Sequence, residues 1–169
     1  LATSEGTARY TERFPKQSEA VSYRRFKRLN LSSLGIGTYL GDATNADDAL
    51  YTEALKLALA SGCNVIDTAI NYRHMRSERQ IGQTLKLLID GGKIRRDEVF
   101  ICTKGGFLPY DVDSGVNPQE YTRSTFIASG LVDPDLGQEL SHSLEPKFIE
   151  HQLETSLKNL GLSSIDLYY

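Results

Sequence analysis

Asn64-Val65-Ile66-Asp67-Thr68-Ala69-Ile70-Asn71-Tyr72 is the stretch that decides the fold. Its β-branched pair, Val65 and Ile66, follows a break at Ser61-Gly62, so the pattern predicts a buried strand that begins after a helix. Asp67 ends the apolar run, where an unpaired carboxylate would be costly to keep away from water. Tyr72 follows beyond the strand, where its phenol can face a cleft. The stretch alone leaves two interpretations open: the mouth of an active site, or a hydrogen-bonded core Asp beside a packing Tyr.

A second apolar run favours the active-site interpretation. Residues 98–104 read Glu98-Val99-Phe100-Ile101-Cys102-Thr103-Lys104, and core packing alone does not explain the terminal Lys. If the two strands are neighbours, Lys104 can pair with Asp67 and approach Tyr72.

These three side chains have a chemical interpretation. A free Tyr has a pKa of about 10 and is a poor proton donor at neutral pH. A cation within about 4–6 Å favours the phenolate and lowers a phenol's pKa by roughly 1–3. With Asp67 holding the ammonium of Lys104 in place, Tyr72 becomes a candidate general acid that protonates an alkoxide as it forms on a carbonyl carbon.

Several motifs occur in a fixed order, and together they closely resemble the first half of an aldo/keto reductase. They are Gly35-Ile36-Gly37-Thr38-Tyr39, Asp67-Thr68-Ala69 with Tyr72, Ser77-Glu78-Arg79-Gln80-Ile81-Gly82, Arg96-Asp97-Glu98-Val99-Phe100-Ile101-Cys102-Thr103-Lys104, and Leu157-Lys158-Asn159-Leu160-Gly161-Leu162 with Ile165-Asp166-Leu167-Tyr168-Tyr169.

The resemblance implies a function and a site. The family reduces an aldehyde or ketone to an alcohol with NADP(H), using a catalytic tetrad of Asp, Tyr, Lys and His. Asp67, Tyr72 and Lys104 match the first three members, and the His normally follows the strand that matches 165–169, beyond the last residue here. The resemblance also places Gly37, Thr38 and Tyr39 beside the nicotinamide, with Asp67 as a further cofactor contact. NAD in place of NADP stays open.

The resemblance implies a (β/α)8 TIM-barrel type of α/β fold. Residues 23–169 would supply the N-terminal half of that barrel, with about the first four strands and three helices, preceded by a β-hairpin at 23–34. Residues 1–22 are expected to be an N-terminal arm without periodic structure. Alternating strand and helix patterns independently predict a parallel sheet.

Two segments have a more specific expectation. The residues Ser77 to Gln80 predict a capping box at the start of a helix. Residues 105–145 form a connection far longer than the usual 2–6 or so between strand and helix, with a helix start at Asn117 and a stop at Gly130. This connection is expected to be a substrate-covering lid, with a docked surface excursion as the alternative.

The chain departs from many relatives just after Tyr72, where Arg73 and Met75 stand in place of glycines. Arg73 and Arg76 would either favour an anionic substrate or face solvent.

Composition excludes several classes of function. The chain has 169 residues, 40% of them hydrophobic and 24% charged, with a formal net charge of −3, which argues against nucleic acid or an anionic membrane as the partner. No His, Cys and carboxylate spacing matches a metal site, so no metal is expected. A cytoplasmic location and a small-molecule carbonyl substrate fit best.

Half a barrel leaves unpaired strand edges, which must be covered. We therefore expect 1–169 to be part of a longer polypeptide, or to self-associate or pair with a missing C-terminal half, and to be inactive alone. The rival hypotheses are a non-catalytic regulatory or binding subunit of the same fold, and a half-barrel that acts by assembling with a partner.

Overall fold

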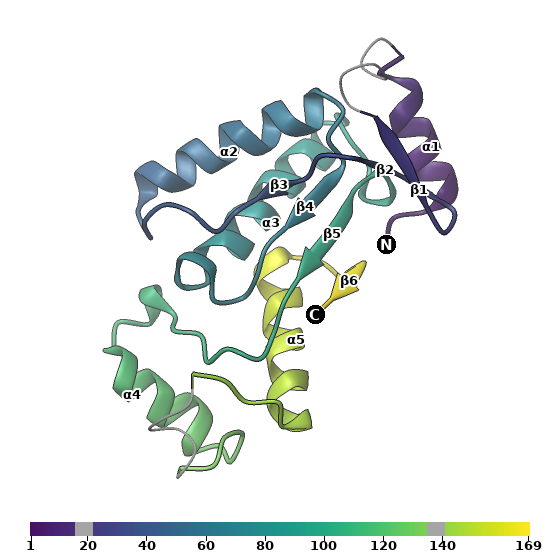
Figure 1. Cartoon of the computed structure of the whole chain (residues 1–169). Coiled ribbons are helices and arrows are strands. Elements are labelled where there is room, and N and C mark those ends of the chain that lie inside the picture. Colours follow the sequence, from purple (N-terminus) through teal and green to yellow (C-terminus); the bar gives the residue numbers. More distant parts are fainter. Residues whose placement is uncertain (16–21, 135–140) are drawn as a thin grey trace.

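A parallel sheet lies at the centre of the molecule. The computed structural model describes residues 1–15, 22–134 and 141–169. Its main sheet contains β3 (Ile36–Gly37), β4 (Val65–Asp67), β5 (Phe100–Thr103) and β6 (Leu167–Tyr168), arranged in sequence order (Figure 1). Each strand runs parallel to its neighbour, which confirms the predicted α/β fold with a parallel sheet.

The helices α2 (Asn45–Ala60), α3 (Arg76–Asp90) and α5 (Pro146–Leu160) connect successive strands and cover one face of this sheet (Figure 1). α5 begins at Pro146, whose missing N–H costs nothing in a first turn, and it ends at Gly161 with φ of 63°. Both boundaries agree with the sequence pattern.

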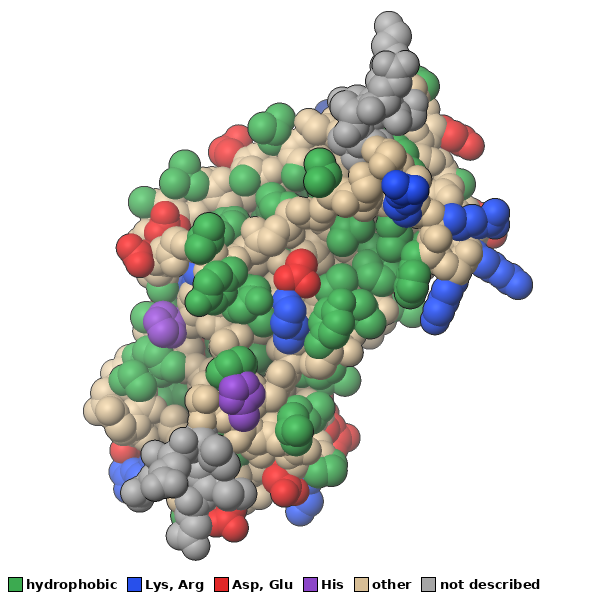
Figure 2. All heavy atoms as spheres, in the orientation of Figure 1, with side chains coloured by type: hydrophobic (Ala, Val, Ile, Leu, Met, Phe, Trp, Pro, Cys, Tyr) green, Lys and Arg blue, Asp and Glu red, His purple; other side chains and the backbone are tan. Residues whose placement is uncertain are grey.

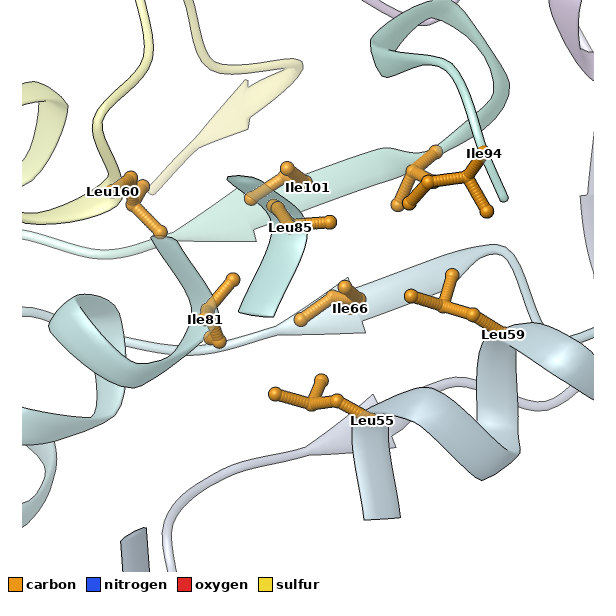
Figure 3. Packing of buried hydrophobic residues seen from close by; sticks show 9 residues of the cluster. Leu55, Leu59, Ile66, Ile81, Leu85, Ile94, Ile101 and Leu160 are labelled. Atoms are coloured by element: carbon orange, nitrogen blue, oxygen red, sulfur yellow. The ribbon is translucent and has the colours of Figure 1, made fainter. Parts of the chain in front are cut away.

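The hydrophobic core lies between the helices and the sheet. Ile66 of β4 and Ile101 of β5 are register partners, and both are fully buried. Figure 3 shows them in one cluster with side chains from α2, α3 and α5. Because side chains alternate along a strand, the residues next to these two, Asp67 and Cys102, point to the opposite face. The packing of one face therefore sets which side chains reach the other.

The predicted hairpin is present at the end of the molecule where β4 and β5 begin. β1 (Tyr23–Phe26) and β2 (Leu29–Ser32) pair antiparallel, with Lys27 in the turn at φ of 52°. The ring of Phe26 lies edge-on to that of Phe100, with the centroids 6.3 Å apart. Among the described residues, hydrophobic side chains gather on the face of the sheet that the helices leave uncovered (Figure 2).

Sequence periodicity did not predict α1 (Ser4–Glu12), and the expectation of an arm without periodic structure is wrong for these residues. Tyr10 is fully buried, and its hydroxyl donates to the carbonyls of Leu59, at 2.5 Å, and Cys63. α1 packs on η3 (Arg96–Glu98), where Arg9 forms an ion pair with Glu98. Residues 16–21 of the expected arm lie outside the described residues.

The capping box expected at Ser77 was also wrong. α3 begins at Arg76, directly after the 3₁₀ turn η2 (Tyr72–Met75). The hydroxyl of Ser77 donates to the carbonyl of Thr38 at 2.7 Å, so it satisfies a buried acceptor on another element instead of the helix's own N–H groups.

The long connection after β5 carries helical segments of its own. These are η4 (Val112–Ser114), α4 (Pro118–Thr122) and the π-helical η5 (Arg123–Ile127), and Asn117 caps α4 as predicted. The side chain of Phe126 is buried against that of Phe148 of α5, with ring centroids 5.4 Å apart. The described parts of 105–145 are thus docked on α5, and their role as a lid stays a prediction.

Within the described ranges, the helices are all too short or too polar to cross a membrane.

Candidate active site

An ion pair marks the carboxyl end of β4 and β5. The ammonium of Lys104 lies 2.6 Å from Oδ1 of Asp67 and donates a second hydrogen bond to the carbonyl of Thr68 at 2.9 Å. The predicted contact between Lys104 and Asp67 is therefore confirmed. The Asp67 side chain is 43% exposed and that of Lys104 is 32% exposed, so a ligand can reach the pair.

Sheet register explains this contact. Asp67 and Cys102 are partners across β4 and β5, and Lys104 follows Cys102 by two positions. Asp67, Cys102 and Lys104 consequently emerge on the same face, the one free of helices. Tyr72 is the first residue of the 3₁₀ turn η2, which follows β4 along the chain.

Tyr72 completes the predicted trio. The ammonium of Lys104 is 5.0 Å from the centroid of the Tyr72 ring. Burial lowers the pKa of Lys104, but its hydrogen bonds to Asp67 and Tyr72 outweigh burial and raise that pKa above the usual 10.5. Lys104 is accordingly a permanent cation near neutral pH, held between a carboxylate and a phenol.

Two further tyrosine rings border the trio. Tyr39 lies edge-on to Tyr72 with the ring centroids 5.0 Å apart, and Tyr39 itself is 66% exposed. The centroid of the Tyr169 ring is 5.9 Å from the Lys104 ammonium. The position of Tyr169 was not predicted from the sequence, although alternation along β6 would place it on the same face as Asp67.

The residues expected to contact a nicotinamide lie next to the trio. An added Cβ at Gly35 would lie 3.2 Å from Val65 Cγ1, whereas a Cβ at Gly37 would meet nothing within 4 Å. Gly35 is thus explained by packing, and Gly37 leaves backbone exposed to open space. Thr38 is buried, and its hydroxyl donates to that of Thr68 at 2.8 Å.

The backbone turns left-handed directly after Tyr72. Arg73, His74 and Met75 have φ of 47°, 55° and 72°. For residues with a Cβ this conformation costs about 1–2 kcal/mol each. Glycine would adopt it freely, and the chain has none at these positions. A strained turn thus carries the candidate proton donor.

Both arginines after Tyr72 form ion pairs within the protein. The side chain of Arg73 is fully buried and forms an ion pair with Asp48 of α2 at 2.6 Å. Arg76 pairs with Asp48 at 2.8 Å and with Asp113 at 2.7 Å. Because their charges are balanced inside the protein, the two residues are not free to attract an anionic substrate, and Arg73 does not face solvent.

A buried carboxyl group connects the elements behind the carboxyl end of β5. Glu78 of α3 is fully buried, accepting from the Thr103 hydroxyl at 2.6 Å and from the Asn159 side-chain amide at 2.9 Å. Burial raises the pKa of Glu78. This residue joins α3, β5 and α5 directly behind the end of the strand that carries Lys104.

Comparisons with known proteins identify the family of the chain. Residues 33–169 match the sequence profile of the aldo/keto reductase family, and the chain belongs to that family. It is similar to the NADH-specific methylglyoxal reductase of Escherichia coli, with 30% identity over 145 residues that cover 83% of this chain and 38% of the relative. It is also similar to the aldo-keto reductase yakc [NADP(+)] of Schizosaccharomyces pombe, with 30% identity over 83% of this chain and 32% of the relative.

The fold is shared with solved structures. A crystal structure of an aldo-keto reductase complexed with NADPH matches with a TM-score of 0.54 and 28% identity, covering 88% of this chain and 35% of that one. The chain thus spans only 38% and 32% of the lengths of these two curated relatives.

Proposed function

We propose that this chain supplies the proton-donating part of an NAD(P)H-dependent reductase that converts an aldehyde or ketone to an alcohol. The single observation behind the proposal is the position of the Lys104 ammonium, 2.6 Å from Asp67 and 5.0 Å from the Tyr72 ring centroid. Core packing requires neither a Lys nor a carboxylate at the carboxyl ends of β4 and β5. The comparisons support the same class of reaction through family membership.

Each residue of the trio has a distinct role in the proposal. A bound nicotinamide would supply the hydride for the carbonyl carbon. Tyr72 donates the proton that the carbonyl oxygen takes up, which is general acid catalysis. Lys104 holds positive charge beside the phenol and favours release of that proton. Asp67 fixes the ammonium of Lys104 at its place beside Tyr72.

NADP(H) is the cofactor we propose, with Gly37, Thr38, Tyr39 and Asp67 beside the nicotinamide. The open space at Gly37 supports this, since a ligand can approach its backbone where a Cβ would otherwise stand. The exposed ring of Tyr39 borders the same space. One similar relative has NADH in its name and another has NADP(+). The comparisons therefore support a nicotinamide coenzyme more strongly than they support NADP over NAD.

We infer that residues 23–169 form the first half of a (β/α)8 barrel, with residues 1–22 outside it. The four parallel strands lie in sequence order with helices on one face, as in such a barrel, whose repeating unit is one strand followed by one helix. Within the described residues β3 and β6 each pair with one strand only, so further strands must complete the barrel. The segment 1–169 alone is therefore expected to give no steady turnover of NADPH with aldehydes.

The direct test uses the full-length protein. Tyr72→Phe keeps the ring and removes the proton donor, so kcat for carbonyl reduction should fall by about 10²–10⁴-fold while coenzyme affinity stays unchanged. Tyr23→Phe is the matched control. The hydroxyl that it removes belongs to strand β1 of the hairpin and donates to the carbonyl of Gly62, away from the trio. A Tyr72→Phe variant as fast as the wild type would refute the proposal.

A further inference from the structure

We propose that Arg73 is a positioning residue, which sets the direction of Tyr72 by anchoring the left-handed turn to the start of α2. The inference rests on the proposed function, since it needs Tyr72 to act in the reaction. It concerns a residue that touches none of the trio's side chains in the described contacts and would act through the backbone.

The anchor is made of contacts on one side of the turn. The Arg73 Nε donates to the carbonyl of Asp42 at 2.9 Å, and Nη2 donates to Oδ1 of Asp48 at 2.6 Å. The guanidinium carbon lies over the Tyr51 ring, 4.8 Å from its centroid, so a cation–π contact adds to the hydrogen bonds. The fork shape of Arg suits this set of acceptors, which a Lys could not match.

Stabilisation of the fold alone explains Arg73 poorly. Its side chain is fully buried, and its Nη1 has no hydrogen-bond partner among the described residues. Burying a donor without a partner is unfavourable, and so is the positive φ of Arg73 itself. Both features persist in a turn that directly follows the candidate proton donor. This combination is typical of a site where geometry is held for function.

The contacts of Arg73 hold the backbone in an unfavourable conformation that it would otherwise leave. The N–H of Tyr72 bonds the carbonyl of Ala69 at 3.1 Å, which fixes the chain before the ring. After the ring, the peptide enters the run of positive φ at Arg73. Without the guanidinium contacts that backbone can relax toward the right-handed region, and the Tyr72 ring would turn with it, away from Lys104.

The experiment compares variants of the full-length protein by steady-state kinetics and coenzyme titration. Arg73→Ala removes the anchor and keeps a Cβ that disfavours the positive φ, so the turn should relax and kcat should fall by about 10–100-fold, as expected for a misplaced catalytic group, with coenzyme affinity unchanged. Arg73→Gly removes the anchor but adopts the turn freely, so its loss should be smaller. Arg96→Ala is the control, since it loses a partly buried ion pair with Asp166, at 2.7 Å, near the start of β5.

A double variant separates positioning from general stability. In a Tyr72→Phe background there is no proton donor to misplace, so adding Arg73→Ala should lower kcat no further. If Arg73→Ala does not fold, the effect of Arg73→Gly on kcat is compared in the wild-type and Tyr72→Phe backgrounds instead.

The outcomes distinguish the two proposals. Wild-type activity in Tyr72→Phe would overturn the proposed function. A slow Tyr72→Phe beside a fully active Arg73→Ala would overturn the role of Arg73 alone. An Arg73 effect of equal size in both backgrounds would also overturn it, because the residue would then act on the fold instead of on Tyr72.

Discussion

Arg79 forms a bidentate ion pair with Asp111, in which Nη1 donates to Oδ1 at 2.8 Å and Nη2 donates to Oδ2 at 2.5 Å. This pair joins α3, the helix behind the candidate site, to the first part of the long connection after β5. Arg79 also reaches Asp113 in η4 at 2.9 Å. Charge therefore helps hold the segment at the rim of the site.

Acid should release this segment. The hydrogen bond from Arg79 holds the pKa of Asp111 below its usual 3.8. The stabilisation is therefore present above about pH 3.8 and is lost as pH falls through the lower folded-state value. We expect protease cleavage near Asp111 to accelerate in that acid range, measured with an acid-stable protease.

Asp111→Asn should already be cleaved faster at neutral pH and should show a weaker acid dependence. Glu120→Gln is the control, since its pair with Arg123 is local and exposed. Identical acid dependence in Asp111→Asn and the wild type would show that another group controls the segment.

The Lys104 charge should be required throughout the neutral range. Because its pKa is raised, the contribution of the charged form is fully present below about pH 10.5 and is lost only as pH rises through the folded-state value. Lys104→Met in the full-length protein should lower kcat by about 10²–10⁴-fold at neutral pH. A variant with unchanged kcat at pH 7 would remove Lys104 from the proposed mechanism.

Two glycines should separate coenzyme contact from packing. A Cβ at Gly82 would lie 2.7 Å from the carbonyl oxygens of Asn159 and Leu160, whereas one at Gly37 meets nothing within 4 Å. Gly82→Ala should destabilise the fold by about 1–3 kcal/mol. Gly37→Ala should keep the melting temperature and raise the coenzyme Kd by about tenfold, a loss of about 1.4 kcal/mol. If Gly37→Ala binds NADPH normally, the proposed nicotinamide position is wrong.

Truncation of a side chain in β4 should destabilise the fold strongly, whereas truncation on the outer side of α2 should have little effect. Ile66 is fully buried, and Ile66→Ala should lower the free energy of unfolding by about 2–5 kcal/mol, measured by urea denaturation. Leu57 is 69% exposed, so Leu57→Ala should stay within about 0.5 kcal/mol of the wild type. Equal effects from the two variants would contradict the burial pattern.

The sequence was most informative where chemistry and periodicity coincide. The apolar runs ending at Asp67 and Lys104 predicted two strands, and the structure pairs these strands in a parallel register that brings the two charges together. The hairpin was also predictable, because alternation and a two-residue turn are local properties.

Two features could not be predicted because they depend on distant partners. The buried residues of α1 are Gly6, Thr7 and Tyr10, so its docking face carries no apolar stripe. Arg73 is of a type that usually faces solvent, and its burial depends on acceptors at Asp42 and Asp48. No glycine marks the left-handed turn that makes this burial geometrically feasible.

The position of α1 also has a consequence for the order of events during synthesis. Strands that pair in sequence order allow each new unit to dock on the one before it as the chain emerges from the ribosome. Ala2 and Thr3 are made before their partners, yet the Ala2 N–H bonds Asp166 at 2.5 Å and the Thr3 N–H bonds the Asp97 carbonyl at 3.0 Å. Ala2 and Thr3 therefore cannot form these two contacts until the chain has been made as far as Asp166 and Asp97.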